Sequence, residues 1–461
     1  MTQADLSKLS KEELIELTLQ TYEQNVQLKA EVEALKLKLE KGKKPPTNSN
    51  NSSQPPSKDQ KPNRPKDKRK RRHGPPMGHV KYERKMVAEP DHLVEVKPQV
   101  CVNCQADLSK ESGKLVDVNQ ITELPEAKAE VIEVRQFEVA CPCCGSQQTS
   151  EPPAGLEMER SFGSRLEATV VYYRQEQHMS YERTKNALAD LHGVKLCEGS
   201  IDRITQRAGK EALQQIQPIQ AAIQSSAVVH SDETGSRVDS QNWYQWVFSS
   251  VKAVLHVIRF DRSVDVVKEV MAGHEAEVWV SDCYKVQMNS PSKAHQLCMA
   301  HQLRNLQAVI DLYPQAFWPK AMQVLFRSAV HLHNQRNTLS PPAFQVQVQR
   351  LERICDRLLQ RQVKYPDEKR LLKRYTNYRN YLFVFLHRTD VPPTNNISER
   401  YLRPAVIHRK VSGCFRSSWG AEAYARIASV IHTAALTGRS PFESIQGLFG
   451  QPSLPLPIGC E

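Results

Sequence analysis

Three acidic residues have the types and positions expected for metal-dependent phosphoryl transfer. Asp232 and Asp282 each follow an apolar run typical of a buried strand, and Glu399 stands near the start of an expected helix. Three carboxylates that meet at one site repel one another and raise one another's pKa, unless divalent cations neutralise them. Oxygen ligands favour Mg²⁺ or Mn²⁺, and two such ions can activate a water or a 3′-hydroxyl for in-line attack at phosphorus. The three residues therefore predict strand cleavage and, on DNA, strand transfer.

Each carboxylate also has a simpler explanation. Glu399 follows Asn396 by three residues, which is the spacing of a helix capping box, and either aspartate could end its strand in a turn. The basic run after Glu399 favours the catalytic interpretation, because no acidic residue interrupts it and a strip of cations suits a DNA backbone. Arg403 could instead pair with Glu399 one helical turn away. The run comprises Arg400, Arg403, Arg409, Lys410 and Arg416.

The elements that would position these carboxylates occur in a defined order. Three strand-like runs between residues 227 and 260 precede a short helix and a fourth strand at 277–282, after which the pattern is mainly helical. This is the order of the ribonuclease H-like fold, which holds its metal through acids on the first strand, the end of the fourth strand and a late helix. Alternation along the first strand places Asp232 on one face and Glu233 on the other.

Two cysteine pairs predict a zinc site. Cys101 and Cys104 form one pair, and Cys141 and Cys144 form another after a gap of 36 residues. A two-residue gap lets both thiolates of a pair point into one turn, so the two pairs can complete a tetrahedral Zn²⁺ site. Strand-like alternation within residues 113–140 would fit a zinc-ribbon-like hairpin. A redox dithiol or reduced structural thiols are the alternatives.

Two further features have no clear assignment. Cys143 is a surplus thiol beside the second pair. Cys298 and His301 have metal-ligand spacing, but no second pair is evident nearby, so we expect a structural role, with metal binding as the alternative.

The N-terminal part is predicted to contain two different segments. Residues 6–40 carry leucines at heptad spacing and predict a short coiled coil, although an amphipathic helix packed on its own protein is an alternative. Residues 43–79 are too poor in apolar side chains to offset chain entropy and should form a flexible linker. Residues 41–80 hold 12 Lys or Arg and two Asp, against a formal charge of +12 for the whole chain. A basic block predicts nucleic-acid contact, with a solubilising charge run as the alternative; it comprises Lys68, Arg69, Lys70, Arg71 and Arg72.

The sequence also limits the class of protein. No apolar run approaches the roughly 18 residues that a membrane helix needs, so a membrane protein is not expected. No export signal is visible, so the expected location is cytoplasmic. Eleven cysteines in such a chain are poor evidence for disulfides, and the close pairs are interpreted first as metal ligands.

The expected fold class is α/β multidomain. A ribonuclease H-like catalytic core with a helical insertion would follow a coiled coil, a disordered basic linker, a zinc-ribbon-like module and a helical domain. The helical domain breaks near residues 192–194 and could be a DNA-reading helix-turn-helix or an ordinary helical hairpin. The insertion could clamp DNA or organise a dimer. The boundaries are 1–42 (coiled coil), 43–80 (linker), 81–155 (zinc module), 156–225 (helical domain), 226–302 (first part of the core), 303–390 (insertion), 391–435 (core helix with Glu399) and 436–461 (tail).

These motifs resemble the catalytic transposases of the insertion-sequence-66 type, one branch of the DDE transposases. The similarity spans nearly the whole chain and includes the leucine-rich helix and the cysteine pairs. The other matching segments, in order, are residues 50–59, 230–235, 281–284, 298–304, 394–404 and 409–413. The resemblance implies that Asp232, Asp282 and Glu399 are the DDE triad. Cys283, in place of a small residue, and the lack of a second aromatic soon after Tyr284 depart from the family pattern, but neither touches a proposed ligand.

The function expected on these grounds is that of a DNA transposase of a bacterial insertion sequence. It would bind the terminal inverted repeats of its element, cut the 3′ strands and join them to target DNA, using Mg²⁺ (or Mn²⁺) and Zn²⁺. Synapsis of two ends favours a homodimer or higher oligomer, with accessory proteins of the same element as candidate partners. Two alternatives stay open: a DNA-binding regulator whose core is only a scaffold, and a structure-specific nuclease without joining activity.

Overall fold

The computed structural model describes residues 21, 24–29, 32, 47–52, 79, 84–153 and 155–450. The predicted coiled coil and basic linker, with Lys68 to Arg72, therefore lie outside the described residues except for isolated stretches.

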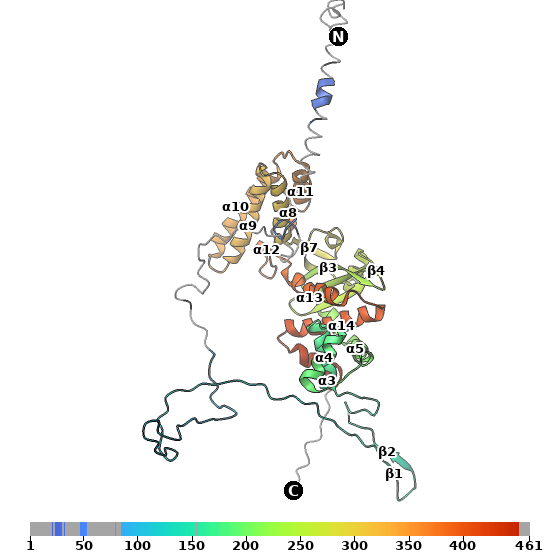
Figure 1. Cartoon of the computed structure of the whole chain (residues 1–461). Helices are drawn as coiled ribbons and strands as arrows, with labels where there is room; N and C mark the ends of the chain where they lie inside the picture. The colour runs from blue at the N-terminus through green and yellow to red at the C-terminus, as the bar shows by residue number, and fades with distance from the viewer. Residues whose placement is uncertain are drawn as a thin grey trace, which may run out of the picture.

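A five-stranded mixed sheet lies at the centre of the larger body, in the order β5-β4-β3-β6-β7 (Figure 1). The first three strands pair antiparallel, whereas β6 runs parallel to β3 and β7 runs parallel to β6. The bounds are β3 Val228–Val238, β4 Gln241–Ser249, β5 Val254–Arg259, β6 Ala276–Ser281 and β7 Ser292–Leu297. The α/β core and the four expected strands are confirmed. The fifth strand was not predicted, because its sequence, SKAHQL, lacks β-branched and aromatic residues.

Helices precede, interrupt and follow the sheet (Figure 1). Gly193 ends α4 in the left-handed region at φ +67°, which produces the break expected near residue 193. No described helix combines the length and apolar character needed to cross a bilayer. The bounds are α3 Ser164–Val171, a π-helix Tyr172–Glu176, α4 Tyr181–His192, α5 Glu198–Glu211, α6 Leu213–Gln224, α7 Val264–Met271, α8 Met299–Leu312, α9 Phe317–Asn334, α10 Pro341–Leu359, α11 Pro366–Asn377, α12 Val384–His387, α13 Asn396–Ser412, α14 Ser418–Leu436 and α15 Pro441–Leu448. Short 3₁₀ segments lie at Gln287–Asn289 and Arg379–Tyr381.

The two faces of the sheet pack against different sets of helices. Val229, Trp246 and Trp279 join one core with α3 to α7, α14 and α15. On the opposite face, Val278 and Val280 join a second core with α8 to α12. The sheet therefore separates the helical region before it in the sequence from the helical insertion.

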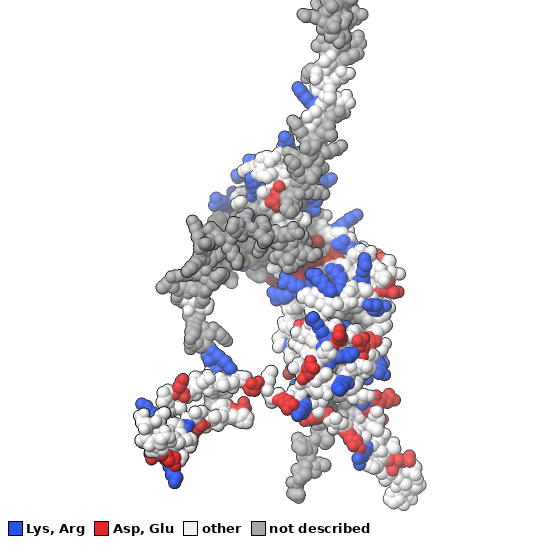
Figure 2. All heavy atoms as spheres, viewed as in Figure 1, with Lys and Arg blue, Asp and Glu red and all other residues white. Residues whose placement is uncertain are grey.

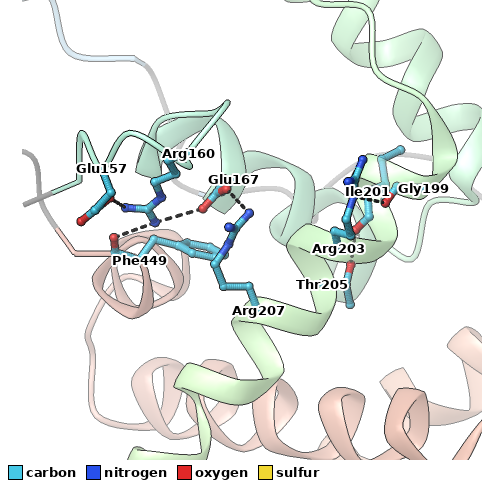
Figure 3. Close-up of polar contacts among 9 residues, drawn as sticks. All are labelled: Glu157, Arg160, Glu167, Gly199, Ile201, Arg203, Thr205, Arg207 and Phe449. Carbon is cyan, nitrogen blue, oxygen red and sulfur yellow. Dashed lines mark hydrogen bonds and ion pairs between the residues drawn. The ribbon is translucent and has the colours of Figure 1, made fainter. Parts of the chain in front are cut away.

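A buried ion network ties the helices before the sheet to the end of the chain (Figure 3). Glu167 on α3 is fully buried and lies 3.1 Å from Arg160 and 2.6 Å from Arg207 of α5. Arg160 also donates to the carbonyl of Phe449, just after α15, at 2.9 Å. Burial raises the pKa of Glu167, and both arginines oppose that shift. The segment expected to be a C-terminal tail thus includes a helix that packs into the body.

Residues 84–153 contain little regular structure. Strands β1 (Glu138–Ala140) and β2 (Gln147–Thr149) pair antiparallel. The apolar side chains before them are exposed, with Val116 92% and Val131 96% accessible. The predicted hairpin is therefore shorter than the alternation suggested, because no core covers the apolar side of residues 131–137.

Candidate active site

The sheet register brings the two aspartates together. In the parallel pair of β3 and β6, His230 lies opposite Val280. Asp232 and Asp282 lie two residues further along these two chains, so they stand on neighbouring strands at the same level. Asp282 directly follows β6, and its Oδ1 accepts a hydrogen bond from the backbone N–H of Tyr284 at 2.9 Å. Asp282 therefore both follows the end of β6 and accepts a turn hydrogen bond, so the simpler explanation, that it ends its strand in a turn, also holds.

Asn395 positions the helix that carries Glu399. It is fully buried, and its Nδ2 donates to the carbonyl of Ser231 at 2.8 Å while its Oδ1 lies 3.2 Å from His230 Nδ1. A second link joins the hydroxyls of Ser398 and Ser249, 3.1 Å apart. These contacts fix the start of α13 against β3 and β4.

The capping-box explanation for Glu399 does not apply. Helix α13 begins at Asn396, which makes Asn395 the N-cap, and no side-chain cap bond forms there. The third helical residue is then Ser398 rather than Glu399. Glu399 lies one position further on, in the first turn, where its side chain is 32% exposed.

Electrostatic contact links all three carboxylates. Burial raises the pKa of Asp232 well above its usual range, and the charges of Glu233, Asp282 and Glu399 raise it further. A backbone N–H donated by Glu233 to Asp232 Oδ1 at 2.9 Å acts in the opposite direction. The register of β3 and β6 and these charge effects bring the three predicted acids near one another, although their oxygens do not form a group within 4.8 Å of one another in the described part of the chain.

Glu233 lies on the other face of β3, as the alternation predicted. Its carboxylate accepts hydrogen bonds from the Arg262 guanidinium at 2.7 Å and from Gln287 Nε2 at 2.5 Å. The Arg262 guanidinium also stacks 4.0 Å from the ring of Tyr284, in the loop after Asp282. Glu233 therefore acts as an internal anchor for that loop.

Helix α8 contributes two groups that sequence reasoning did not place at the site. His301 Nδ1 lies 3.5 Å from Glu399 Oε1, and an Arg304 nitrogen lies 3.7 Å from the same oxygen. The partners expected from sequence for Glu399 did not include either residue; Arg403 was the alternative considered. The spacing of Cys298 and His301 was the signal that could have indicated them.

Cys298 connects the starts of α8 and α13. Its thiol is fully buried and accepts a hydrogen bond from the backbone N–H of Asn395 at 3.2 Å. Burial raises the pKa of Cys298 to about 11. One ligand atom each from Cys298, His301 and Glu399 lie within 4.8 Å of one another, and among described residues no other group of three or more potential ligands is this close.

The predicted basic run differs in exposure along α13. Arg400, Arg403 and Lys410 are exposed, whereas Arg409 is half-buried and donates to the carbonyl of Gly235 on β3. Figure 2 shows Lys and Arg side chains gathered where α13 lies in Figure 1. Arg416, beyond the helix, is exposed too.

Each cysteine pair forms the same tight turn. The N–H of Cys101 donates to Ala106 at 2.9 Å, and the N–H of Cys141 donates to Ser146 at 2.8 Å. Backbone N–H groups of the turn lower the pKa of Cys101, those of Cys104 and Asn103 most strongly. Cys104 and Cys144 are exposed, and the two turns do not meet in one cluster among the described residues. A zinc site that joins them stays a prediction.

Comparison with known proteins identifies the family. The profile described as transposase IS66 family matches residues 159–423, which is more than half of the 461-residue chain and includes all three carboxylates. No curated protein matches the chain. Membership of a transposase family implies an activity that cuts and joins DNA, and divalent metal use is typical of such enzymes. The chain therefore belongs to the IS66 family of transposases.

Proposed function

We propose that the protein is a DDE transposase in which Asp232, Asp282 and Glu399 cleave DNA strands at the element ends and transfer them to target DNA. The observation that carries the proposal is the register of β3 and β6, which sets Asp232 and Asp282 at the same level, together with the charges of Asp282 and Glu399 that act on Asp232. The strand order β5-β4-β3-β6-β7, with three antiparallel strands followed by two parallel ones, supports a ribonuclease H-like core. Three acids separated by up to 167 positions would rarely share a site without a function.

The three carboxylates fit divalent cations chemically. Like charges and burial raise the pKa of Asp232, and a bound cation would offset both effects. A buried oxygen of Glu399, Oε1, has no hydrogen-bond partner among the described residues, which leaves it available as a ligand. Asp232, Asp282 and Glu399 would hold Mg²⁺ or Mn²⁺. Bound, such ions supply activation of the attacking oxygen and stabilisation of the leaving one.

The chain's own groups would orient the reacting DNA. Asn395 holds the start of α13, and so Glu399, against β3, and Arg304 offers a cation beside the Glu399 carboxylate. The exposed Arg400, Arg403 and Lys410 on α13 suit contacts to phosphates, which they would make without reading sequence. Arg409, bonded to β3, would instead help to hold the helix in place.

The helical insertion could extend this basic surface. Helix α11 carries Lys369, Arg370, Lys373 and Arg374, and the first three are exposed. Arg374 acts electrostatically on the thiol of Cys283, next to Asp282, so this helix lies beside the catalytic loop. Its exposed face would then continue the path of the DNA away from the carboxylates. This favours a DNA clamp as one role of the insertion.

The other parts of the chain would bind and pair the DNA ends. We assign Zn²⁺ to Cys101, Cys104, Cys141 and Cys144, and phosphate contacts to the basic block of Lys68 to Arg72. Helices α4 and α5, joined by a turn at Gly193, could read DNA as a helix-turn-helix. A coiled coil in residues 1–42 would pair two subunits. Each subunit would then deliver one end of the element for joining.

The test is cleavage and joining of labelled DNA that carries the element's ends, with Mg²⁺ or Mn²⁺. Glu399→Gln and Asp282→Asn are compared with the intact protein and with Glu422→Gln, a control on α14 whose carboxylate pairs with Arg426 at 2.7 Å. We expect the two site variants to lose at least about 10³-fold in rate while still binding the ends, because a neutral amide cannot replace a metal-holding carboxylate. The control should retain full activity.

Other outcomes would identify the alternative functions. Equal products from Glu399→Gln and the intact protein would remove Glu399 from the triad. Cleavage without any joined product would indicate a nuclease. Binding without chemistry in every condition, including addition of the element's accessory proteins, would indicate a regulator.

A further inference from the structure

A set of three chemically different ligands stands directly beside the proposed catalytic acids. Cys298 and His301 lie at the start of α8, and Glu399 lies in the first turn of α13. One ligand atom from each lies within 4.8 Å of the other two. The ligands come from positions about 100 residues apart, so local turn geometry alone does not explain their convergence.

Two of the three ligand atoms lack a hydrogen-bond partner. His301 Nδ1 and Glu399 Oε1 are both buried atoms without one among the described residues, and they lie 3.5 Å apart. A buried polar atom without a hydrogen-bond partner is destabilising, so such atoms usually mark a missing partner. The thiol of Cys298 already accepts the N–H of Asn395, and a coordinated sulfur can keep that bond.

We propose that Cys298, His301 and Glu399 form a binding site for a thiophilic divalent cation, with Zn²⁺ as the natural ligand. Sulfur, imidazole and carboxylate together are the ligand types that zinc selects, whereas Mg²⁺ requires oxygen. Three protein ligands leave a fourth position for water. The thiolate would form on coordination, releasing its proton to solvent.

Arg304 is the group that opposes occupancy. Its guanidinium lies 3.7 Å from Glu399 Oε1 and already partly neutralises that carboxylate. The side chain is 24% exposed, so it can turn towards solvent when the cation enters. Removal of this positive charge should therefore tighten cation binding.

Occupancy of the site would inhibit strand cleavage. Glu399 would be held by the thiophilic ion together with Cys298 and His301, and its carboxylate would then be withdrawn from the proposed Mg²⁺ site. Glu399 belongs to both sets of ligands, which places the new site against the proposed catalytic one. This effect on cleavage rests on the proposed function, whereas binding of the cation does not.

Cobalt absorption tests binding without reference to activity. The full-length protein is titrated with Co²⁺, and thiolate-to-cobalt charge-transfer absorption is compared with that of Cys298→Ser. Cys355→Ser is the matched control, because Cys355 is equally buried but lies on α10. Since the cysteine pairs of residues 101–144 also bind Co²⁺, the signal of interest is the difference between variants.

We expect the intact protein and Cys355→Ser to bind one more cobalt–thiolate equivalent than Cys298→Ser. His301→Gln keeps the thiol and should weaken this binding at least about tenfold, whereas Arg304→Gln should strengthen it. Circular dichroism establishes that each variant is folded. Identical absorption of Cys298→Ser and the intact protein would overturn the proposal, and so would an unchanged affinity in folded His301→Gln.

The functional experiment measures the cleavage rate at fixed Mg²⁺, and for each variant the rate with added Zn²⁺ is divided by the rate without it. This ratio should be at least about tenfold lower in the intact protein and in Cys355→Ser than in Cys298→Ser. Equal inhibition of all three would remove the regulatory role. Absence of cleavage in every sample would contradict the proposed function, while the cobalt titration would still decide the metal site.

Discussion

The carboxylate site and the cysteine module are assembled in opposite ways. Asp232, Asp282 and Glu399 come from separate segments, and a paired sheet with the apolar clusters around it, including those that contain Tyr401, Leu402 and Ala405 of α13, holds these segments in place. The cysteine pairs each form a complete local turn, yet the chain between them is largely exposed, with Val116 and Val131 open to solvent. Packing positions the first site, whereas the second has almost no apolar core to do so.

This difference indicates what each site needs from a metal. Protein contacts already hold the elements that carry the carboxylates, so cations there would serve chemistry more than folding. In the module each cysteine pair forms its own turn, but the two turns do not come together in one cluster of ligands among the described residues. Binding of a structural Zn²⁺ contributes about 10–16 kcal/mol to the folding free energy of small domains, which is enough to replace the apolar core that the module lacks.

The largest expected effect is therefore loss of the module's structure when the proposed zinc is removed. Cys104→Ser should lose one zinc equivalent per chain and make residues 84–153 sensitive to protease, while residues 155–450 stay resistant. Cys143→Ser is the matched control, because Cys143 is also exposed and stands outside the predicted ligand set. Zinc content and limited proteolysis measure both. Identical zinc content in the two variants would show that the pairs do not share an ion.

The next effect tests how packing positions the carboxylates. Asn395→Ala removes the bond to the carbonyl of Ser231 and the contact with His230, so α13 loses its attachment to β3. Misplacement of Glu399 by about 1 Å should lower the cleavage rate about 10²-fold. Unpaired buried groups should also lower the free energy of unfolding by about 1–3 kcal/mol.

Asn396→Ala is the control for this variant, because the neighbouring asparagine is exposed. It should leave the cleavage rate nearly unchanged and should change the free energy of unfolding by no more than about 0.5 kcal/mol. Equal losses in both variants would mean that helix propensity at the start of α13, not the Asn395 contacts, controls the site.

The same contrast explains which parts could be predicted from sequence. The strand pattern predicted the α/β core, because alternation along each strand is a local signal, whereas the register that sets Asp232 beside Asp282 depends on pairing of β3 with β6 across 50 positions. The role of Asn395 could not be predicted, since its partners Ser231 and His230 lie more than 160 positions away.

The neighbours of Glu399 could not be predicted either. His301 and Arg304 lie on α8, about 100 positions away in the sequence, and they contact Glu399 because α8 and α13 start close together in the fold. In the module the sequence predicted structure that is absent. Alternation in residues 131–137 predicted a strand, but these residues are not in a strand, because alternation stabilises a strand only where a partner strand and a core exist.

Substitution of a single glycine tests how tightly the helices beside the sheet pack. A Cβ added to Gly209 on α5 would lie 2.8 Å from Ala423 Cα of α14 and even closer to its Cβ. Gly209→Ala should therefore force these helices apart and lower the free energy of unfolding by about 1–3 kcal/mol. Gly199→Ala, on the same helix with nothing within 4 Å of its added Cβ, should be neutral or stabilising by up to about 1 kcal/mol. Urea denaturation compares the two, and equal stability would show that the α5–α14 contact is loose.

The smallest effect concerns pH, and it separates the packed body from the module once more. His256 Nε2 and His432 Nδ1 lie 2.8 Å apart in the core, and Gln245 Nε2 lies 3.3 Å from His256 Nδ1. Burial lowers the pKa of His256 well below its usual range and that of His432 to about 4. The unfolded chain then binds protons that the folded body cannot, so stability should fall as the pH drops from about 6.5 towards about 4, by about 1.4 kcal/mol per pH unit for each proton excluded. Urea denaturation of the intact protein at pH 7 and pH 5 measures this fall, and His432→Gln should make it shallower, whereas His274→Gln on the surface should not. If the fall is the same in all three proteins, the acid sensitivity arises outside this buried pair.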